Sequence, residues 1–133
     1  MTLSVFTAAR PVVAPGKEGV VYYPSMGLQV STDNGKTFTR LDSLAACMAV
    51  GLGKGKTDSD PYTIFVWGKP TKDDPIGLYW SEDEGKTWSR VNDDQHQFGG
   101  PGNGFFVVGD MNKYGRVYMS TVGLGIVYGD LVQ

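Results

Sequence analysis

Short apolar runs recur along the whole chain, and clusters of glycine, proline, aspartate and asparagine separate them. No stretch shows the 3.6-residue period of an amphipathic helix. The pattern predicts strands at Val20–Pro24, Leu28–Ser31, Phe38–Leu41, Met48–Leu52, Thr63–Gly68, Leu78–Ser81, Trp88–Val91, Phe105–Gly109, Arg116–Ser120 and Ile126–Tyr128. Arg10–Ala14 adds a candidate at a sheet edge or a strand start, because Pro11 cannot donate to a ladder. About eleven short strands at near-regular spacing indicate an all-β fold.

One segment of the chain occurs twice, at an offset of 50 residues. Gly27–Leu41 aligns with Gly77–Val91, and eight of the fifteen positions are identical. The shared core reads S-x-D-x-G-K-T-[FW] and lies between two predicted strands in both copies. The repeated residues are Ser31, Asp33, Gly35, Thr37 and Phe38, and then Ser81, Asp83, Gly85, Thr87 and Trp88.

The composition of this core is that of a rigid hairpin turn. Asp33 and Asp83 can accept hydrogen bonds from backbone N–H groups, as in Asx-turns. The glycine in each copy can adopt a positive φ without a Cβ penalty, and the aromatic residue can pack the turn onto the sheet. A catalytic or metal-binding role for the two aspartates is the alternative. The structural role is favoured.

The two copies resemble the Asp-box, or sialidase-type (BNR), repeat of β-propellers. A propeller blade is a four-stranded antiparallel sheet of about 40–50 residues, which agrees with the offset. Three further segments narrow the resemblance to the closing blades of xyloglucanases of glycoside hydrolase family 74. They are Ala9–Gly19, Asn92–Gly100 and Tyr114–Asp130. The resemblance covers nearly all of this chain, but only the tail of the family's catalytic region.

This resemblance implies a propeller without a catalytic pair of its own. Family members are built from two seven-bladed propellers that hold xyloglucan in the cleft between them, with two catalytic aspartates near the propeller starts. Neither catalytic motif matches any residue here, so we assign no catalytic residue. The third repeat also departs from the pattern, because only three residues follow Asp130. The final blade is therefore expected to lack its fourth strand.

Strand counting predicts a single partial propeller over residues 1–133, with blades at about 8–43, 44–93 and 104–133. Residues 2–7, with Leu3–Phe6 as the strand, are candidates to complete the last blade in the same chain or in a neighbour. Three blades cannot close a ring, and their outer faces would be large apolar patches. We therefore expect self-association, with a dimer favoured. A fragment or an open monomer is the alternative.

The longer loops are expected to gather on the face opposite the repeated turns, where the resemblance places ligands. Sugar sites combine aromatic rings with converging polar groups. The candidates for binding β-glucan or xyloglucan are Trp67, Lys69, Asp93, Asp94, His96, Gln97 and Phe98. Each also has a structural alternative: Asp93 and Asp94 could form an Asx-turn, and His96 could anchor the loop.

Composition excludes several other classes. The 133 residues carry a net charge of −2 and scattered basic residues, which argues against a nucleic-acid-binding surface. No apolar run is long enough to span a bilayer, and the start lacks the features of a signal peptide. Localisation stays open, although the resembled enzymes act outside the cell. A lone Cys47 and a lone His96 exclude a disulfide framework and a zinc site, and we expect no metal or cofactor.

Three functions from different classes follow. The first is a non-catalytic carbohydrate-recognition module. The second is a glycosidase active only in a larger assembly, with Asp73 and Asp74 or Asp93 and Asp94 as its carboxylates. Adjacent residues in one loop rarely reach the required separation of about 5–5.5 Å or about 6.5–9.5 Å. The third is a structural fragment that binds no glycan. The first is favoured slightly over the third, and both over the second.

Overall fold

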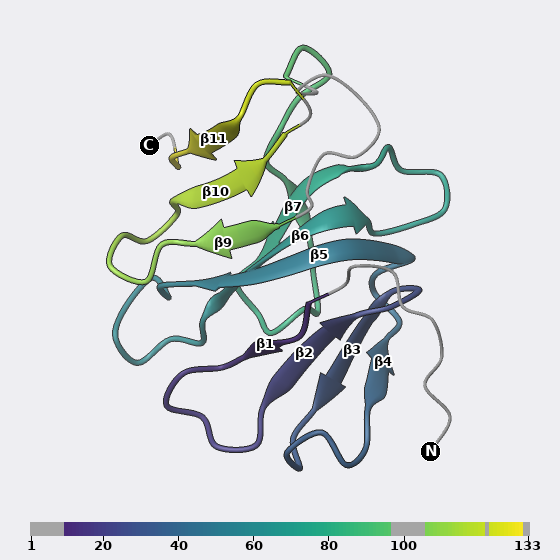
Figure 1. The fold of residues 1–133 in the computed structure, drawn as a ribbon, viewed down its shortest axis with the longest axis vertical. Coiled ribbons are helices and arrows are strands. Elements are labelled where there is room, and N and C mark those ends of the chain that lie inside the picture. Colours follow the sequence, from purple (N-terminus) through teal and green to yellow (C-terminus); the bar gives the residue numbers. More distant parts are fainter. Residues whose placement is uncertain (1–9, 97–105, 122, 132–133) are drawn as a thin grey trace.

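The computed structural model describes residues 10–96, 106–121 and 123–131, which fold into three antiparallel sheets (Figure 1). Blade 1 consists of β1 (Val12–Val13), β2 (Val21–Pro24), β3 (Leu28–Ser31) and β4 (Thr39–Leu41). Blade 2 consists of β5 (Ala46–Gly53), β6 (Thr63–Lys69), β7 (Gly77–Ser81) and β8 (Ser89–Arg90). Blade 3 consists of β9 (Val107–Gly109), β10 (Val117–Ser120) and β11 (Ile126–Gly129). The described residues contain no helix, and the fold is the all-β partial propeller expected from the sequence.

All eleven predicted strands are present, although several boundaries differ. β5 begins two residues before the predicted Met48, because a bulge between Cys47 and Ala49 lets its ladder with β6 continue. β8 is shorter than predicted, since only two of its residues pair with β7. The predicted strand start at Phe105 and the predicted closing strand at Leu3–Phe6 lie outside the described residues.

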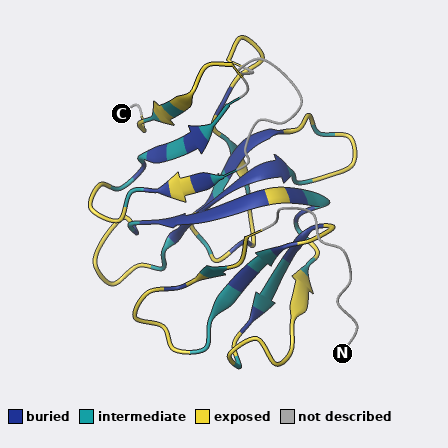
Figure 2. Ribbon diagram, viewed as in Figure 1, coloured by how far each residue is buried: buried dark blue, intermediate teal, exposed yellow. Residues whose placement is uncertain are grey.

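Blade 2 lies between the other two sheets, and both of its faces are buried (Figures 1 and 2). Successive side chains of a strand point to opposite faces. β6 therefore sends Ile64 and Val66 toward blade 1, and Phe65 and Trp67 toward blade 3. The core between blades 1 and 2 also holds Ala14, Tyr22, Leu28, Leu44, Cys47, Val50, Leu52 and Tyr79. The core between blades 2 and 3 also holds Ala49, Leu78, Val107, Val117 and Met119.

β5 and β9, the inner strands of blades 2 and 3, approach each other closely at glycine positions, where no side chain separates the two backbones. A Cβ at Gly51 would lie 2.2 Å from the carbonyl oxygen of Val107. A Cβ at Gly109 would lie 2.5 Å from the backbone of Gly53. Glycine at these positions is what allows β5 and β9 to lie against one another.

The outer faces of blades 1 and 3 carry apolar side chains that no described residue covers. On blade 1, Val13 is exposed and the rings of Tyr23 and Phe38 lie 6.3 Å apart. On blade 3, Ile126 and Tyr128 are exposed, and Tyr128 pairs with Tyr118 at 6.2 Å between ring centroids. Both faces have the character of an interface between blades.

Candidate functional site

Two repeat turns (residues 31–38 and 81–88) are built by the same hydrogen bonds. Asp83 Oδ1 accepts from the backbone N–H of Thr87 at 2.9 Å and from the hydroxyl of Ser81 at 2.7 Å. Its Oδ2 accepts from the Thr87 hydroxyl at 2.6 Å. Gly85 has φ 87° and donates its N–H to Ser81 Oγ at 2.9 Å. The aspartate therefore closes the turn.

The first repeat turn uses the equivalent groups. Asp33 accepts from the Thr37 backbone N–H and the Ser31 hydroxyl, both at 2.8 Å, and from the Thr37 hydroxyl at 2.5 Å. Hydrogen bonds from the threonine side chain, then from other donors of the turn, lower the pKa of each aspartate from 3.8 to about 2. A carboxylate with this many internal donors is a structural group rather than a general acid or base.

The second repeat turn also fastens blade 2 to blade 1. Trp88 Nε1 donates to Ser43 Oγ at 3.0 Å, and the Ser43 hydroxyl donates to the carbonyl of Gly85. The indole packs against the core between the two blades. Trp88 therefore packs its turn onto the fold, and the neighbouring blade is part of the contact.

The lowered pKa values of the aspartates in the repeat turns predict that the stability of the fold depends on pH. The folded-state pKa of Asp83 is depressed to about 2, so its stabilising contribution is fully present above the unfolded value near 3.8. It is lost as the pH falls toward about 2. We expect Asp83→Asn to lower Tm by roughly 3–6 °C at pH 7 and to flatten the fall of Tm between pH about 4 and about 2.

Calorimetric Tm values across that pH range check this prediction. Asp42→Asn is the matched control, because Asp42 is exposed and has no side-chain hydrogen bond among the described residues. An equal effect of the two substitutions would show that the turn carboxylate contributes no special stability.

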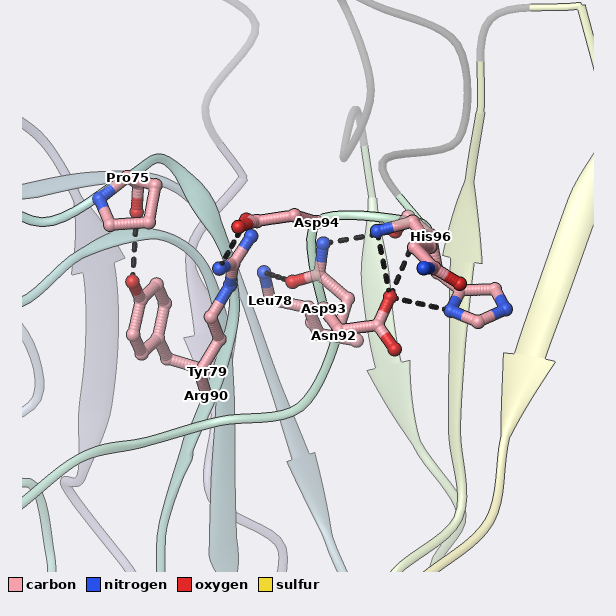
Figure 3. Close-up of polar contacts among 9 residues, drawn as sticks. Pro75, Leu78, Tyr79, Arg90, Asn92, Asp93, Asp94 and His96 are labelled. Atoms are coloured by element: carbon pink, nitrogen blue, oxygen red, sulfur yellow. Dashed lines mark hydrogen bonds and ion pairs between the residues drawn. The ribbon is translucent and has the colours of Figure 1, made fainter.

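The end of the sheets away from the repeat turns, which we call the loop end, carries residues 25–27, 70–76 and 91–96. Figure 3 shows the link that follows β8 at this end. Asn92 is buried there; its Oδ1 accepts from the N–H of Leu78 at 2.7 Å and its Nδ2 donates to the carbonyl of His96 at 3.0 Å. Asn92 therefore holds the link against β7.

Asp93 and His96 form a pair at the tip of this link. Asp93 Oδ1 lies 2.6 Å from His96 Nδ1 and accepts from the backbone N–H groups of Gln95 and His96, both at 2.9 Å. The hydrogen bond from His96 is the main cause of a lowered pKa at Asp93. Both side chains are about two-thirds exposed. Asp93 thus forms an Asx-turn, and the imidazole Nε2 has no hydrogen-bond partner among the described residues.

A second polar pair lies beside the first (Figure 3). Arg90 donates to Asp94 Oδ1 at 2.8 Å, and the hydroxyl of Tyr79 donates to the carbonyl of Pro75 at 2.8 Å. Burial, then the charge of Asp74, raises the pKa of Tyr79. The first contact holds the residues after β8 to that strand, and the second holds the β6–β7 link to β7.

The remaining candidates fall in different places. Trp67 is only 7% exposed and packs between blades 2 and 3, so its ring is not available as a sugar platform. This corrects the expectation for Trp67: a strand end on the central blade is covered on both faces. Lys69 donates to the carbonyl of Lys72 at 3.0 Å, and among the described residues it makes no hydrogen bond to Asp93 or His96. Gln97 and Phe98 lie outside those residues.

A second acidic candidate shapes a turn. Asp74 Oδ2 accepts from the N–H of Thr71 at 3.0 Å and from its hydroxyl at 2.7 Å. Asp73 is exposed beside it. Among the described residues, no group of three or more histidine, cysteine, aspartate or glutamate side chains is arranged to hold a metal ion. No helix in the described part of the chain is long and apolar enough to cross a membrane.

A cavity of about 360 Å³ lies between blade 2 and blade 3, next to the Asp93–His96 pair. The cavity was not predicted from the sequence pattern. Its lining residues are Leu78, Val91, Asn92, Asp93, His96, Val117, Met119, Val127, Tyr128, Gly129 and Asp130. The repeat at an offset of 50 residues could have indicated this cavity. It aligns Val91 and Asp93 with Leu41 and Ser43, which lie at the interface between blades 1 and 2.

Two curated proteins resemble this chain in sequence. Xyloglucanase Xgh74A of Acetivibrio thermocellus is 43% identical over 118 residues, which are 87% of this chain and 14% of that protein. A probable oligoxyloglucan-reducing end-specific xyloglucanase of Neosartorya fischeri is 35% identical over 135 residues, 98% of this chain and 16% of that protein. No family model matches the chain.

Two solved structures share the fold. The GH74 enzyme of Niastella koreensis superposes with a TM-score of 0.83 at 43% identity, over 93% of this chain and 18% of that one. The chain is related to GH74 xyloglucanases. The GH74 xyloglucanase of Xanthomonas campestris gives a TM-score of 0.80 at 32% identity, over 98% of this chain and 18% of that one. The chain thus spans less than a fifth of the relatives that it matches.

Proposed function

We propose that this chain is a non-catalytic propeller segment that binds xyloglucan or a related β-glucan through its loop end. The relationship to xyloglucanases carries the proposal, since the curated relatives described above are named for that activity. The Asp93–His96 pair and the Arg90–Asp94 pair supply exposed hydrogen-bonding groups for sugar hydroxyls. We also propose that the two repeat turns are Asp-box repeats of the sialidase type.

The contacts of the carboxylates favour binding over hydrolysis. Asp93 and Asp94 are committed to His96 and Arg90, and Asp74 is committed to Thr71. A glycosidase needs one carboxyl with a raised pKa facing a second across the scissile bond, whereas the pKa of Asp93 is lowered. The loop end therefore suits recognition.

Calorimetric titration with xyloglucan oligosaccharides tests the proposal. We expect saturable heat with the wild-type chain and an affinity roughly two- to tenfold lower for His96→Ala, as befits the loss of one hydrogen bond. Lys36→Ala is the matched control, because Lys36 is exposed on the first repeat turn at the other end of blade 1. Its affinity should equal that of the wild type.

Other outcomes of the same titration contradict the proposal. A flat trace from folded protein would leave the structural alternative, in which the segment binds no glycan. Heat that never returns to baseline, with new reducing ends in the product, would indicate hydrolysis and favour the glycosidase alternative.

We also propose that the chain self-associates through its outer blade faces. Exposed Val13 and Ile126 lie on faces that resemble the buried interfaces between blades. Light scattering should give about twice the chain mass, and Val13→Glu or Ile126→Glu should reduce it to one chain. Met26→Glu is the control, since Met26 is exposed in the turn between β2 and β3 and not in a strand. A wild-type mass of one chain would contradict dimerisation.

A further inference from the structure

The two repeat turns differ in the residue at their tip. Asn34 and Glu84 occupy equivalent positions, both are exposed, and both adopt a positive φ, of 64° and 60°. Asparagine adopts this conformation more readily than most residues other than glycine. The hydrogen bonds that hold the glycine and the threonine are the same in both turns. The first turn therefore presents Asn34-Gly35 in the setting where the second presents Glu84-Gly85.

An asparagine that precedes a glycine has the chemistry of spontaneous deamidation. After the Gly35 backbone nitrogen loses its proton to solvent, it can attack Asn34 Cγ. The new N–Cγ bond closes a five-membered imide, and the Cγ–Nδ2 bond breaks and releases ammonia. One water molecule then opens the imide, at the new bond to give aspartate or at the original peptide bond to give isoaspartate. Glycine favours the attack because no side chain hinders its nitrogen.

The second repeat turn lacks this reaction. The Glu84 side chain ends in a carboxylate, which carries no amine leaving group and is a poor target for a nitrogen nucleophile. Its longer side chain would also have to close a six-membered ring. The second turn is therefore an internal reference with the same backbone shape and without the reactive pair.

In the folded first turn, the attacking nitrogen is engaged. Gly35 donates its N–H to Ser31 Oγ at 2.8 Å, and Ser31 is only 1% exposed. The N–H of Asn34 is also bonded, to the carbonyl of Gly19 at 3.1 Å. An amide held in this way reaches solvent base only when the structure opens locally. Deprotonation of Gly35 therefore requires the turn to open.

Isoaspartate at position 34 would prevent the turn from closing again. It adds one carbon to the backbone between the Cα of residue 34 and the nitrogen of Gly35. Two hydrogen bonds span this point, each between residues four positions apart. One joins Gly35 to Ser31, and the other joins Thr37 to Asp33, both at 2.8 Å. Both depend on the normal backbone length, so the reaction turns a brief opening into a lasting change.

From these contacts we infer that Asn34 is a deamidation site, and that the Gly35–Ser31 hydrogen bond limits its rate by holding the first repeat turn closed. Water is the only co-reactant. The rate rises with pH, because the Gly35 nitrogen must lose a proton before it attacks. The inference is independent of the proposed glycan binding, since the repeat turns lie away from the loop end.

Peptide mapping by mass spectrometry, after incubation at mildly alkaline pH, tests the inference. The tryptic peptide of residues 18–36 contains Asn34 and no other asparagine. We expect Asn34 to react at least about tenfold more slowly in the folded chain than in this peptide incubated free. Ser31→Ala should raise the rate in the folded chain about fivefold, as befits the loss of one hydrogen bond.

Ser81→Ala is the matched control, because it removes the equivalent hydroxyl from the second repeat turn. It should leave the rate at Asn34 unchanged. Equal rates in the folded chain and the free peptide, or no acceleration in folded Ser31→Ala, would each overturn the inference. Acceleration of the same size by Ser81→Ala would also overturn it.

Hydrogen–deuterium exchange of the Gly35 amide gives a second test that does not require Ser31→Ala to fold. Exchange and deamidation both need the turn to open, so low concentrations of urea should speed both by a similar factor. A Gly35 amide that exchanges in the folded chain as fast as in the free peptide would contradict the inference.

Discussion

Replacing Gly51 by alanine is expected to destabilise the fold by about 3 kcal/mol or more. The new Cβ would lie 2.2 Å from the carbonyl oxygen of Val107 and 2.9 Å from the Cα of Val108. Both neighbours are backbone atoms, so no side-chain rotation can relieve the clash. β5 and β9 would have to separate, and the core between blades 2 and 3 would lose contacts along the length of both strands.

Urea denaturation of the two proteins measures this loss as a shift in the transition midpoint. Gly129→Ala is a matched control, because its Cβ would meet only Val117 Cγ1 at 3.9 Å and no positive φ constrains it. That change should be within about 0.5 kcal/mol of neutral. If the two variants were equally stable, the close approach of the inner strands would not be a feature of the folded state.

The glycines also show what the sequence could and could not predict. The turn glycines were predictable, since Gly35 and Gly85 lie in a repeated motif whose φ requirement follows from the residue types around them. The close approach at Gly51 was not, because it depends on which strand of the next blade lies opposite. The local sequence pattern determines where strands and turns form. Contacts between residues 50 or more positions apart determine which residue type an individual position tolerates.

Trp67 shows a different limit at the candidate site. The uninterrupted apolar run Ile64–Trp67 predicts a strand and is typical of a strand buried on both faces, and the expectation of an accessible ring at Trp67 did not take this into account. Asp93 and His96 could be named as polar loop residues from sequence. Their pairing and the cavity beside them depend on where β8 ends relative to β11, which composition does not encode.

Removing the ring of Phe65 is the second large effect that we expect. Phe65 is 1% exposed, lies in the core between blades 2 and 3, and stacks on Trp80 at 6.0 Å between ring centroids. Phe65→Ala should cost about 3–5 kcal/mol, from lost burial, the residual cavity and the lost ring contact. Chemical denaturation measures the cost, and Phe38→Ala provides the control with identical chemistry.

Phe38 is 43% exposed and contacts Tyr23 on the outer face of blade 1, so its loss should cost less than about 1.5 kcal/mol. Because Phe65 packs against Val117 and Met119 in one core, Phe65→Ala should also speed amide exchange in β10 more than in β2. Equal costs for the two variants would mean that the core between blades 2 and 3 contributes no more than an exposed turn. If Phe65→Ala sped amide exchange equally in β10 and β2, the blades would open together. Blade 3 would then depend on its packing against blade 2 no more than blade 1 does.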